Sequence, residues 1–162
     1  MGMSDYVRGL RERVGHELLF MPSAHCVVCD GAGSILLVRH VEGRWMLPGG
    51  AVEPGETPAD AVRRECWEEA SVLVEPVRIL GVYGGPEYAV TYRNGDRAMW
   101  VVTVFEGRVL SGEPRPGDDE TIDVRWAAPG ELDGLEMSPA SRATIADALS
   151  GVPFAEATWR PS

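Results

Sequence analysis

Amphipathic stretches and apolar runs succeed one another along the chain and predict a mixture of helices and strands. A short helix is expected over 4–14, where apolar residues recur along one side, and a closing helix over 139–149 after a capping serine, Ser138. Asn94-Gly95 is a signal for a type I′ hairpin between two strands. The expected strands are 24–30, 34–41, 73–83, 87–92, 97–108 and 120–127.

A central helix is predicted over 58–70, which has no internal glycine and follows a capping threonine. On this helix Glu65, Glu68 and Glu69 fall within an arc of roughly 100°. On an open surface such a cluster is a solvated acidic face. If the cluster is partly buried it needs a cation, and hard carboxylate oxygens suit Mg²⁺ or Mn²⁺.

The 162 residues are expected to form a single domain, 1–162, with a disordered or loosely packed tail from about residue 152. The net charge of −10 argues against general nucleic-acid binding and against a membrane-surface role. No apolar run approaches the roughly 20 residues that cross a bilayer, and the first residues lack a signal-peptide core. The expected compartment is therefore the cytoplasm.

The three cysteines predict no metal or redox site. Cys26 and Cys29 lie in one predicted strand, where residues three apart point to opposite faces. With Cys66 they are expected to be reduced, buried thiols.

The stretch around the central helix resembles the Nudix box. The matching residues keep the spacing G-x5-E-x7-R-E-x2-E-E-x2-V and are Gly50, Glu56, Arg64, Glu65, Glu68, Glu69 and Val72. Cys66 and Ser71 depart from the family pattern, and Ser71 replaces a glycine that would end the helix in a left-handed conformation. The resemblance implies an α+β fold, a Nudix-type α/β/α sandwich with a mixed sheet.

The resemblance also implies hydrolysis of a phosphoanhydride bond and a role for each matched residue. Glu65, Glu68 and Glu69, with the backbone carbonyl of Gly50, occupy the metal-binding positions, so the implied cofactor is Mg²⁺, with Mn²⁺ as the alternative. Glu56 and Arg64 form a salt bridge in the family and are expected to support the site.

The remaining assignments leave alternatives open. The general base is expected to be Glu120, in a loop before the last strand, with Glu65 as the rival. Arg39 is a candidate for contacting a substrate phosphate or for a surface ion pair. Tyr83 is a candidate for base stacking or for core packing. The three histidines, His16, His25 and His40, are expected to be structural.

The implied substrate is a small nucleotide. A nucleoside diphosphate linked to another group, such as ADP-ribose or a nucleotide sugar, is the first candidate, because the stretches 81–87 and 92–96 look like those of family members with that activity. An ordinary or oxidised nucleoside triphosphate is the alternative. A non-catalytic nucleotide sensor is a third reading, and a homodimer is a candidate assembly.

Overall fold

A computed structural model describes residues 4–151, so the predicted tail from about residue 152 lies outside the described residues. The helices are α1 (Asp5–Val14), α2 (Pro58–Ala70) and α3 (Pro139–Ser150), with short 3₁₀ helices η1 (Pro86–Tyr88) and η2 (Pro129–Gly134). The strands are β1 (Leu18–Val28), β2 (Ile35–His40), β3 (Trp45–Met46), β4 (Gly49–Ala51), β5 (Val72–Tyr83), β6 (Ala89–Thr91), β7 (Arg97–Gly112) and β8 (Thr121–Ala127). Thr57 caps α2 and Ser138 caps α3, as predicted. Ser4 caps α1.

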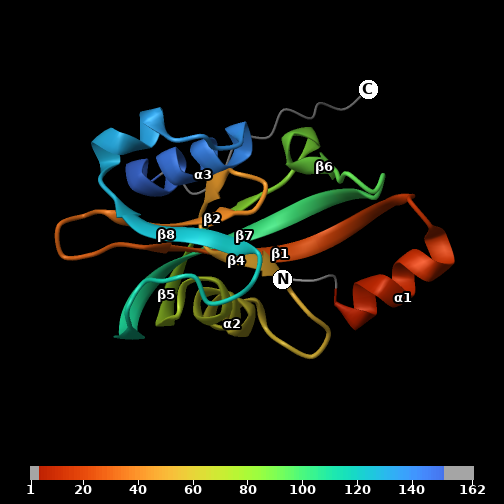
Figure 1. Ribbon diagram of the computed structural model, residues 1–162, viewed down its shortest axis with the longest axis horizontal. Helices are drawn as coiled ribbons and strands as arrows, with labels where there is room; N and C mark the ends of the chain where they lie inside the picture. The colour runs from red at the N-terminus through yellow and green to blue at the C-terminus, as the bar shows by residue number, and fades with distance from the viewer. Residues whose placement is uncertain (1–3, 152–162) are drawn as a thin grey trace, which may run out of the picture.

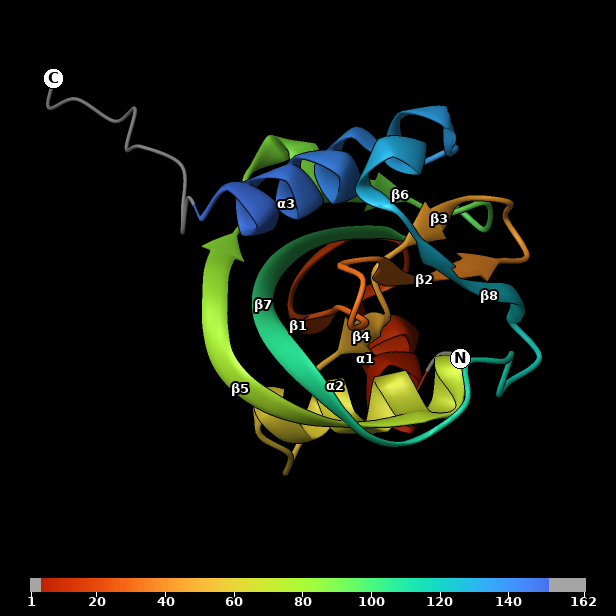
Figure 2. The same ribbon diagram turned by 90° about the vertical axis from the view of Figure 1, so that its left-hand side faces the viewer.

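The strands form two sheets between helices. In the larger sheet the order is β4-β1-β7-β5, with β6 also paired to β7. β1 and β7 are parallel and the other pairs are antiparallel, so this sheet is mixed. The smaller sheet has the order β3-β2-β8. With α2 on one side of the strands and α3 on the other, the arrangement confirms the predicted α+β fold (Figures 1 and 2).

Two buried clusters hold these layers together. Next to α2, Val62 and Cys66 pack with Cys26 of β1 and Val38 of β2. On the α3 side, Ile145 belongs to a cluster with other residues of the same two strands. Burying each large apolar side chain contributes about 1.5–3 kcal/mol, so packing fixes the rotation of α2 about its axis. That rotation decides which way its glutamates point.

β1 begins earlier than predicted. It starts at Leu18, six residues before the expected strand 24–30, because its whole length pairs with the parallel strand β7. The partner strand supplies backbone hydrogen bonds to residues whose own pattern did not predict a strand. The expectation of three buried thiols is wrong for Cys29, which lies just beyond β1 and is exposed, whereas Cys26 and Cys66 are buried.

The hairpin between β6 and β7 is not of type I′. The N–H of Gly95 donates to the carbonyl of Tyr92, and the N–H of Tyr92 donates to the carbonyl of Asp96, each at 2.9 Å. Gly95 has φ of 88°, but Asn94 does not have positive φ, since Ser71 is the one non-glycine residue with positive φ among residues 4–151. A type I turn followed by a left-handed glycine therefore closes this hairpin.

None of the helices in the described part of the chain is long and apolar enough to span a membrane.

Candidate active site

The start of α2 is capped by its own sequence. The side chain of Thr57 accepts a hydrogen bond from the N–H of Asp60 at 3.2 Å, and the Asp60 carboxylate accepts from the N–H of Thr57 at the same distance. This reciprocal capping box satisfies two free N–H groups, and Pro58 occupies the first helical turn. The helix therefore begins at a defined residue, which sets the position of every glutamate along it.

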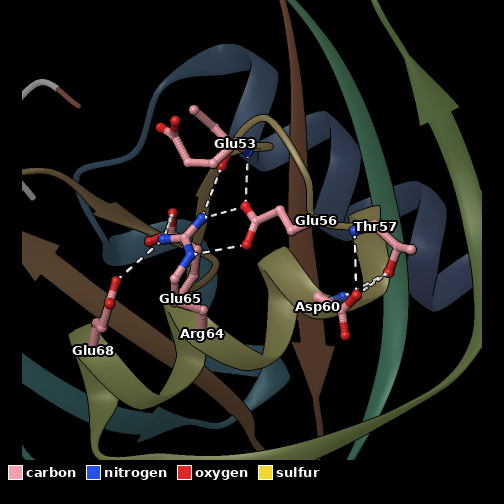
Figure 3. Close-up of polar contacts among 8 residues, drawn as sticks. Glu53, Glu56, Thr57, Asp60, Arg64, Glu65 and Glu68 are labelled. Atoms are coloured by element: carbon pink, nitrogen blue, oxygen red, sulfur yellow. Dashed lines mark hydrogen bonds and ion pairs between the residues drawn. The ribbon is translucent and has the colours of Figure 1, made fainter. Parts of the chain in front are cut away.

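Arg64 links the loop before α2 to the glutamates on the helix (Figure 3). Its guanidinium contacts both carboxylate oxygens of Glu56, at 2.7 and 3.1 Å, and donates to the backbone carbonyl of Ala51 at 3.0 Å. The same group reaches Glu65 at 2.8 Å and Glu68 at 3.1 Å. The Glu56–Arg64 ion pair that the resemblance implied is present, and Arg64 is also a counter-charge for the cluster.

Glu65 lies beneath the backbone of Gly50. Only 1% of Glu65 is exposed, and a Cβ added to Gly50 would collide with its carboxylate. Burial, reinforced by the charge of Glu69, raises the pKa of Glu65 to about 7. The backbone of Gly50 therefore lies directly against the carboxylate of Glu65. Ionising this buried carboxylate is costly unless a cation is nearby.

Glu69 is held by residues other than Arg64. It is 2% exposed; one oxygen contacts Nε2 of His40 at 2.8 Å and the other accepts the N–H of Gly49 at 2.9 Å. The hydrogen bond with Glu69 raises the pKa of His40. Sequence reasoning missed His40 as part of the site. The signal was its place in β2, two residues after Val38 and on the same side of the strand, where Val38 packs beside α2.

The C-terminal end of α2 is closed by a distant loop. Ser71 adopts the left-handed conformation expected of the glycine it replaces, with φ of 56° and ψ of 29°. The N–H groups of Arg115 and Gly117 donate to the carbonyls of Ala70 and Glu69. These bonds satisfy helix carbonyls that would otherwise lack partners, and they dock the loop that precedes Glu120 beside the glutamate cluster.

Glu120 follows this loop directly. Its carbonyl accepts the N–H of Val41 at 2.9 Å, and the next residue, Thr121, pairs with His40 in the β2–β8 ladder. The backbone of Glu120 therefore lies beside the strand end that carries His40, the residue in contact with Glu69.

Arg39 and Tyr83 are placed elsewhere in the structure. The guanidinium of Arg39 donates to the carbonyl of Gly43 at 3.0 Å and lies 5.9 Å from the ring centre of Trp45. Tyr83 is 8% exposed at the end of β5 nearest α3, in the cluster that contains Ile145, and its ring lies 6.3 Å from that of Tyr88 (Figure 2). The structure does not bring Tyr83 to the glutamates, and its surroundings are those of the core alternative.

The comparisons with known proteins agree with this geometry. A family model described as the NUDIX domain matches residues 19–148. The chain belongs to the Nudix family. A MutT-like protein of Streptomyces ambofaciens is 33% identical to this Nudix protein over 136 residues, 80% of each chain.

A second relative and a solved structure extend the match. A Bacillus subtilis (strain 168) protein named "Putative 8-oxo-dGTP diphosphatase" is 28% identical over 145 residues, which cover 89% of this chain and 90% of that one. A NUDIX hydrolase from Nitrosomonas europaea has the same fold, with a TM-score of 0.69 and 23% identity over 84% of this chain and 93% of the other. The chain is a Nudix pyrophosphohydrolase, and the family to which it belongs acts on small-molecule nucleotides.

The donors of the Nudix site are suited in chemistry to a divalent cation. Within residues 4–151, no three acidic, histidine or cysteine side chains are already gathered as a ligand set. Arg64 contacts Glu65 and Glu68, and His40 contacts Glu69. The cluster still has more carboxylates than cationic partners. Its oxygen donors, and the glycine backbone that approaches Glu65 where a Cβ would collide, match the preferences of a hard cation.

Proposed function

We propose that Glu65, Glu68 and Glu69, with the backbone carbonyl of Gly50, hold Mg²⁺ or Mn²⁺ and that this protein uses the cation to hydrolyse a nucleotide phosphoanhydride. The observation that carries the proposal is the burial of Glu65 and Glu69, 1% and 2% exposed, one turn apart on α2. Two buried carboxylates this close repel each other, and Arg64 and His40 compensate the three glutamates only in part, because they are two cationic partners for three carboxylates. A sensor would have no need to keep this costly arrangement.

The residues around the cluster have separate tasks in this proposal. When bound, the cation neutralises phosphate charge and polarises the phosphorus to be attacked. Glu56 and Arg64 hold the loop 51–56 against α2, so that the Gly50 carbonyl stays beside Glu65. Arg64 at the edge of the cluster adds positive charge where the substrate phosphates approach.

The metal dependence is tested by turnover with Mg²⁺, with Mn²⁺ and with excess EDTA. Hydrolysis is expected with either cation and none with EDTA, and turnover that survives EDTA would contradict the metal mechanism. The variant Glu69→Gln keeps the shape of the side chain but removes its charge, so metal affinity and activity should both fall strongly.

Glu120 is the proposed general base. Its loop is docked on the end of α2, and its backbone lies beside the strand end that carries His40. Glu65 is the rival, because its carboxylate lies in the glutamate cluster itself, buried and against the backbone of Gly50. Glu120→Gln should lower kcat and leave metal affinity nearly intact, whereas Asp119→Asn, an exposed neighbour in the same loop, should change neither. A wild-type kcat for Glu120→Gln would make Glu65 the leading base.

Two substrate classes remain candidates, and their products separate them. The name of the Bacillus subtilis relative supports a purine nucleoside triphosphate, ordinary or oxidised. The resemblance of the stretches 81–87 and 92–96 supports a nucleoside diphosphate derivative such as ADP-ribose. We propose to compare dGTP, 8-oxo-dGTP, ADP-ribose, a nucleotide sugar and CDP-choline at one concentration. Release of pyrophosphate with a nucleoside monophosphate would identify the first class, and two phosphomonoesters without pyrophosphate the second.

A further inference from the structure

The four glutamates near α2 are divided between two cationic partners. Arg64 contacts Glu56, Glu65 and Glu68, whereas Glu69 contacts His40 and the backbone of Gly49. Glu69 therefore depends on a histidine from another element of the fold for its orientation.

The fold gives His40 a defined approach to α2. In β2 the residues Leu36 and Val38 pack in the cluster beside α2, and His40 continues that side of the strand. The pairing register of β2 with β8 shifts between Arg39 and His40. The extra residue at this shift, Ile122, lies in β8, so β2 keeps its alternation and the ring of His40 reaches Glu69.

Glu69 needs donors at this position. It lies in the last turn of α2, where the helix dipole disfavours a negative charge and where there is no basic residue in the same turn. An ionised carboxylate only accepts hydrogen bonds, so Nε2–H of His40 donates to one oxygen while the N–H of Gly49 donates to the other. Each oxygen keeps a further lone pair, so these two bonds leave room for a cation.

We propose that His40 is a positioning residue that holds the Glu69 carboxylate in the orientation in which it binds the divalent cation. The inference rests on the metal site of the proposed function. The opposite role would be that of a substitute cation, which the metal must displace from Glu69. The two roles predict opposite changes in metal affinity when His40 is removed.

The test is a titration of the purified, metal-free protein with Mn²⁺ at fixed pH, in which electron paramagnetic resonance measures free Mn²⁺. His40→Phe should weaken Mn²⁺ binding by about 10- to 100-fold, the usual effect of removing a partner that orients a metal ligand. His40→Gln keeps an N–H donor at a similar reach and should restore most of the affinity.

His16 provides the matched control. It also contacts a carboxylate, that of Asp96 at 2.7 Å, but its partner lies in the β6–β7 hairpin and its side chain is 69% exposed. His16→Phe should leave Mn²⁺ affinity unchanged. Thermal melts of each variant without metal would show that the protein is folded, and His40→Gln provides a second measurement if His40→Phe does not fold.

The outcomes separate the inference from the proposed function. If wild type binds Mn²⁺ and both His40 variants bind it equally well or more tightly, the positioning role is overturned while the metal site stands. An equal loss in His16→Phe and His40→Phe would also overturn it. If wild type binds no Mn²⁺, the metal site and the inference fail together.

Discussion

The start of α2 is completed by residues three positions apart, Thr57 and Asp60, whereas its end is completed by residues 29 or more positions away in the chain. At the end, Arg115 and Gly117 satisfy helix carbonyls, and His40 holds Glu69. Local capping makes the helix begin at a fixed residue in any context. The distant contacts exist only after the sheets have formed, so the chemistry at the end of α2 depends on the whole fold.

The glutamates also differ in whether their partners are close or distant in the sequence. Glu56, Glu65 and Glu68 share Arg64, which lies within eight residues of each of them. Glu69 is shared between β2 and the start of β4. Loss of the Arg64 contacts should therefore loosen the loop before α2. Loss of the contacts of Glu69 should change the orientation of that carboxylate with little effect on the other glutamates.

The largest effect is expected for Gly50→Ala, which disrupts the contact between β4 and Glu65. The added Cβ would collide with a carboxylate that is 1% exposed and bonded to Arg64, so either the carboxylate or the Gly50 backbone must shift. We expect kcat/KM to fall by about 100-fold, because a shift of about 1 Å at a catalytic group can have that cost.

The control for this substitution is Gly130→Ala, whose Cβ would meet nothing within 4 Å. It should leave kcat/KM unchanged. Steady-state kinetics of both variants, with the thermal melts that show whether they fold, would decide the matter. Near-wild-type activity of Gly50→Ala would show that the backbone and Glu65 do not act together.

Arg64→Gln removes the shared partner at the start of the cluster. The side chain is 25% exposed and bridges three carboxylates, so its loss leaves them repelling one another. We expect the free energy of unfolding to fall by about 3 kcal/mol without metal. Saturating Mg²⁺ should stabilise the variant more than wild type, because the cation replaces part of the missing charge. Urea melts with and without Mg²⁺ measure this, and an equal Mg²⁺ effect in both proteins would contradict it.

The packing of His25 against Gly49 should make the stability of the protein depend on pH. A Cβ on Gly49 would collide with the backbone and ring of His25, so the two residues pack directly together. Burial lowers the pKa of His25 to about 4 from an ordinary 6.5. Between these values the unfolded chain binds more protons than the folded one, so stability is present above pH 6.5 and declines as the pH falls toward 4.

The contribution of His25 to this decline is on the order of 2–3 kcal/mol. Unfolding free energies of wild type and His25→Gln, measured by urea melts at intervals from pH 7 to 4, should differ in slope, with the variant flatter. Parallel profiles would show that His25 is protonated as readily in the folded protein as in the unfolded chain.

The smallest effect is expected for Ser71→Gly. Ser71 occupies a left-handed conformation that glycine adopts without steric cost, so the substitution should raise stability by up to about 1 kcal/mol. The glutamates are held from other elements, so kcat should change little. Ser71→Ala, which keeps the strain and removes the hydroxyl, is the matched control. A lower melting temperature for the glycine variant would mean that the hydroxyl stabilises the helix end by more than the strain costs.

The catalytic helix and its identity could be predicted because their determinants are close in sequence. The spacing from Gly50 to Val72, the cap at Thr57 and the face shared by Glu65, Glu68 and Glu69 all lie within 23 residues. The glycine of the family pattern pointed to a left-handed helix end but left open whether Ser71 would adopt it, and the structure shows that it does. A helix of regular geometry converts spacing into direction without help from the rest of the chain.

The partners across the fold could not be predicted in the same way. The early start of β1, the three-residue hairpin loop and the exposed Cys29 depend on which strand pairs with which. The alternation of residues along β2 predicts on which side of the strand His40 lies. It does not predict which element packs on that side.

By itself, then, the sequence determined the family, the capped start of α2 and the three glutamates on one of its faces, because helical geometry and local hydrogen bonds act over a few residues. Only the tertiary structure decided that Glu65 and Glu69 are buried, that His40 reaches Glu69 and that Tyr83 packs near α3. Burial and long-range hydrogen bonds exist only when two sheets and two helices have packed together. They are properties of pairs of distant segments, and no single stretch of the chain contains them.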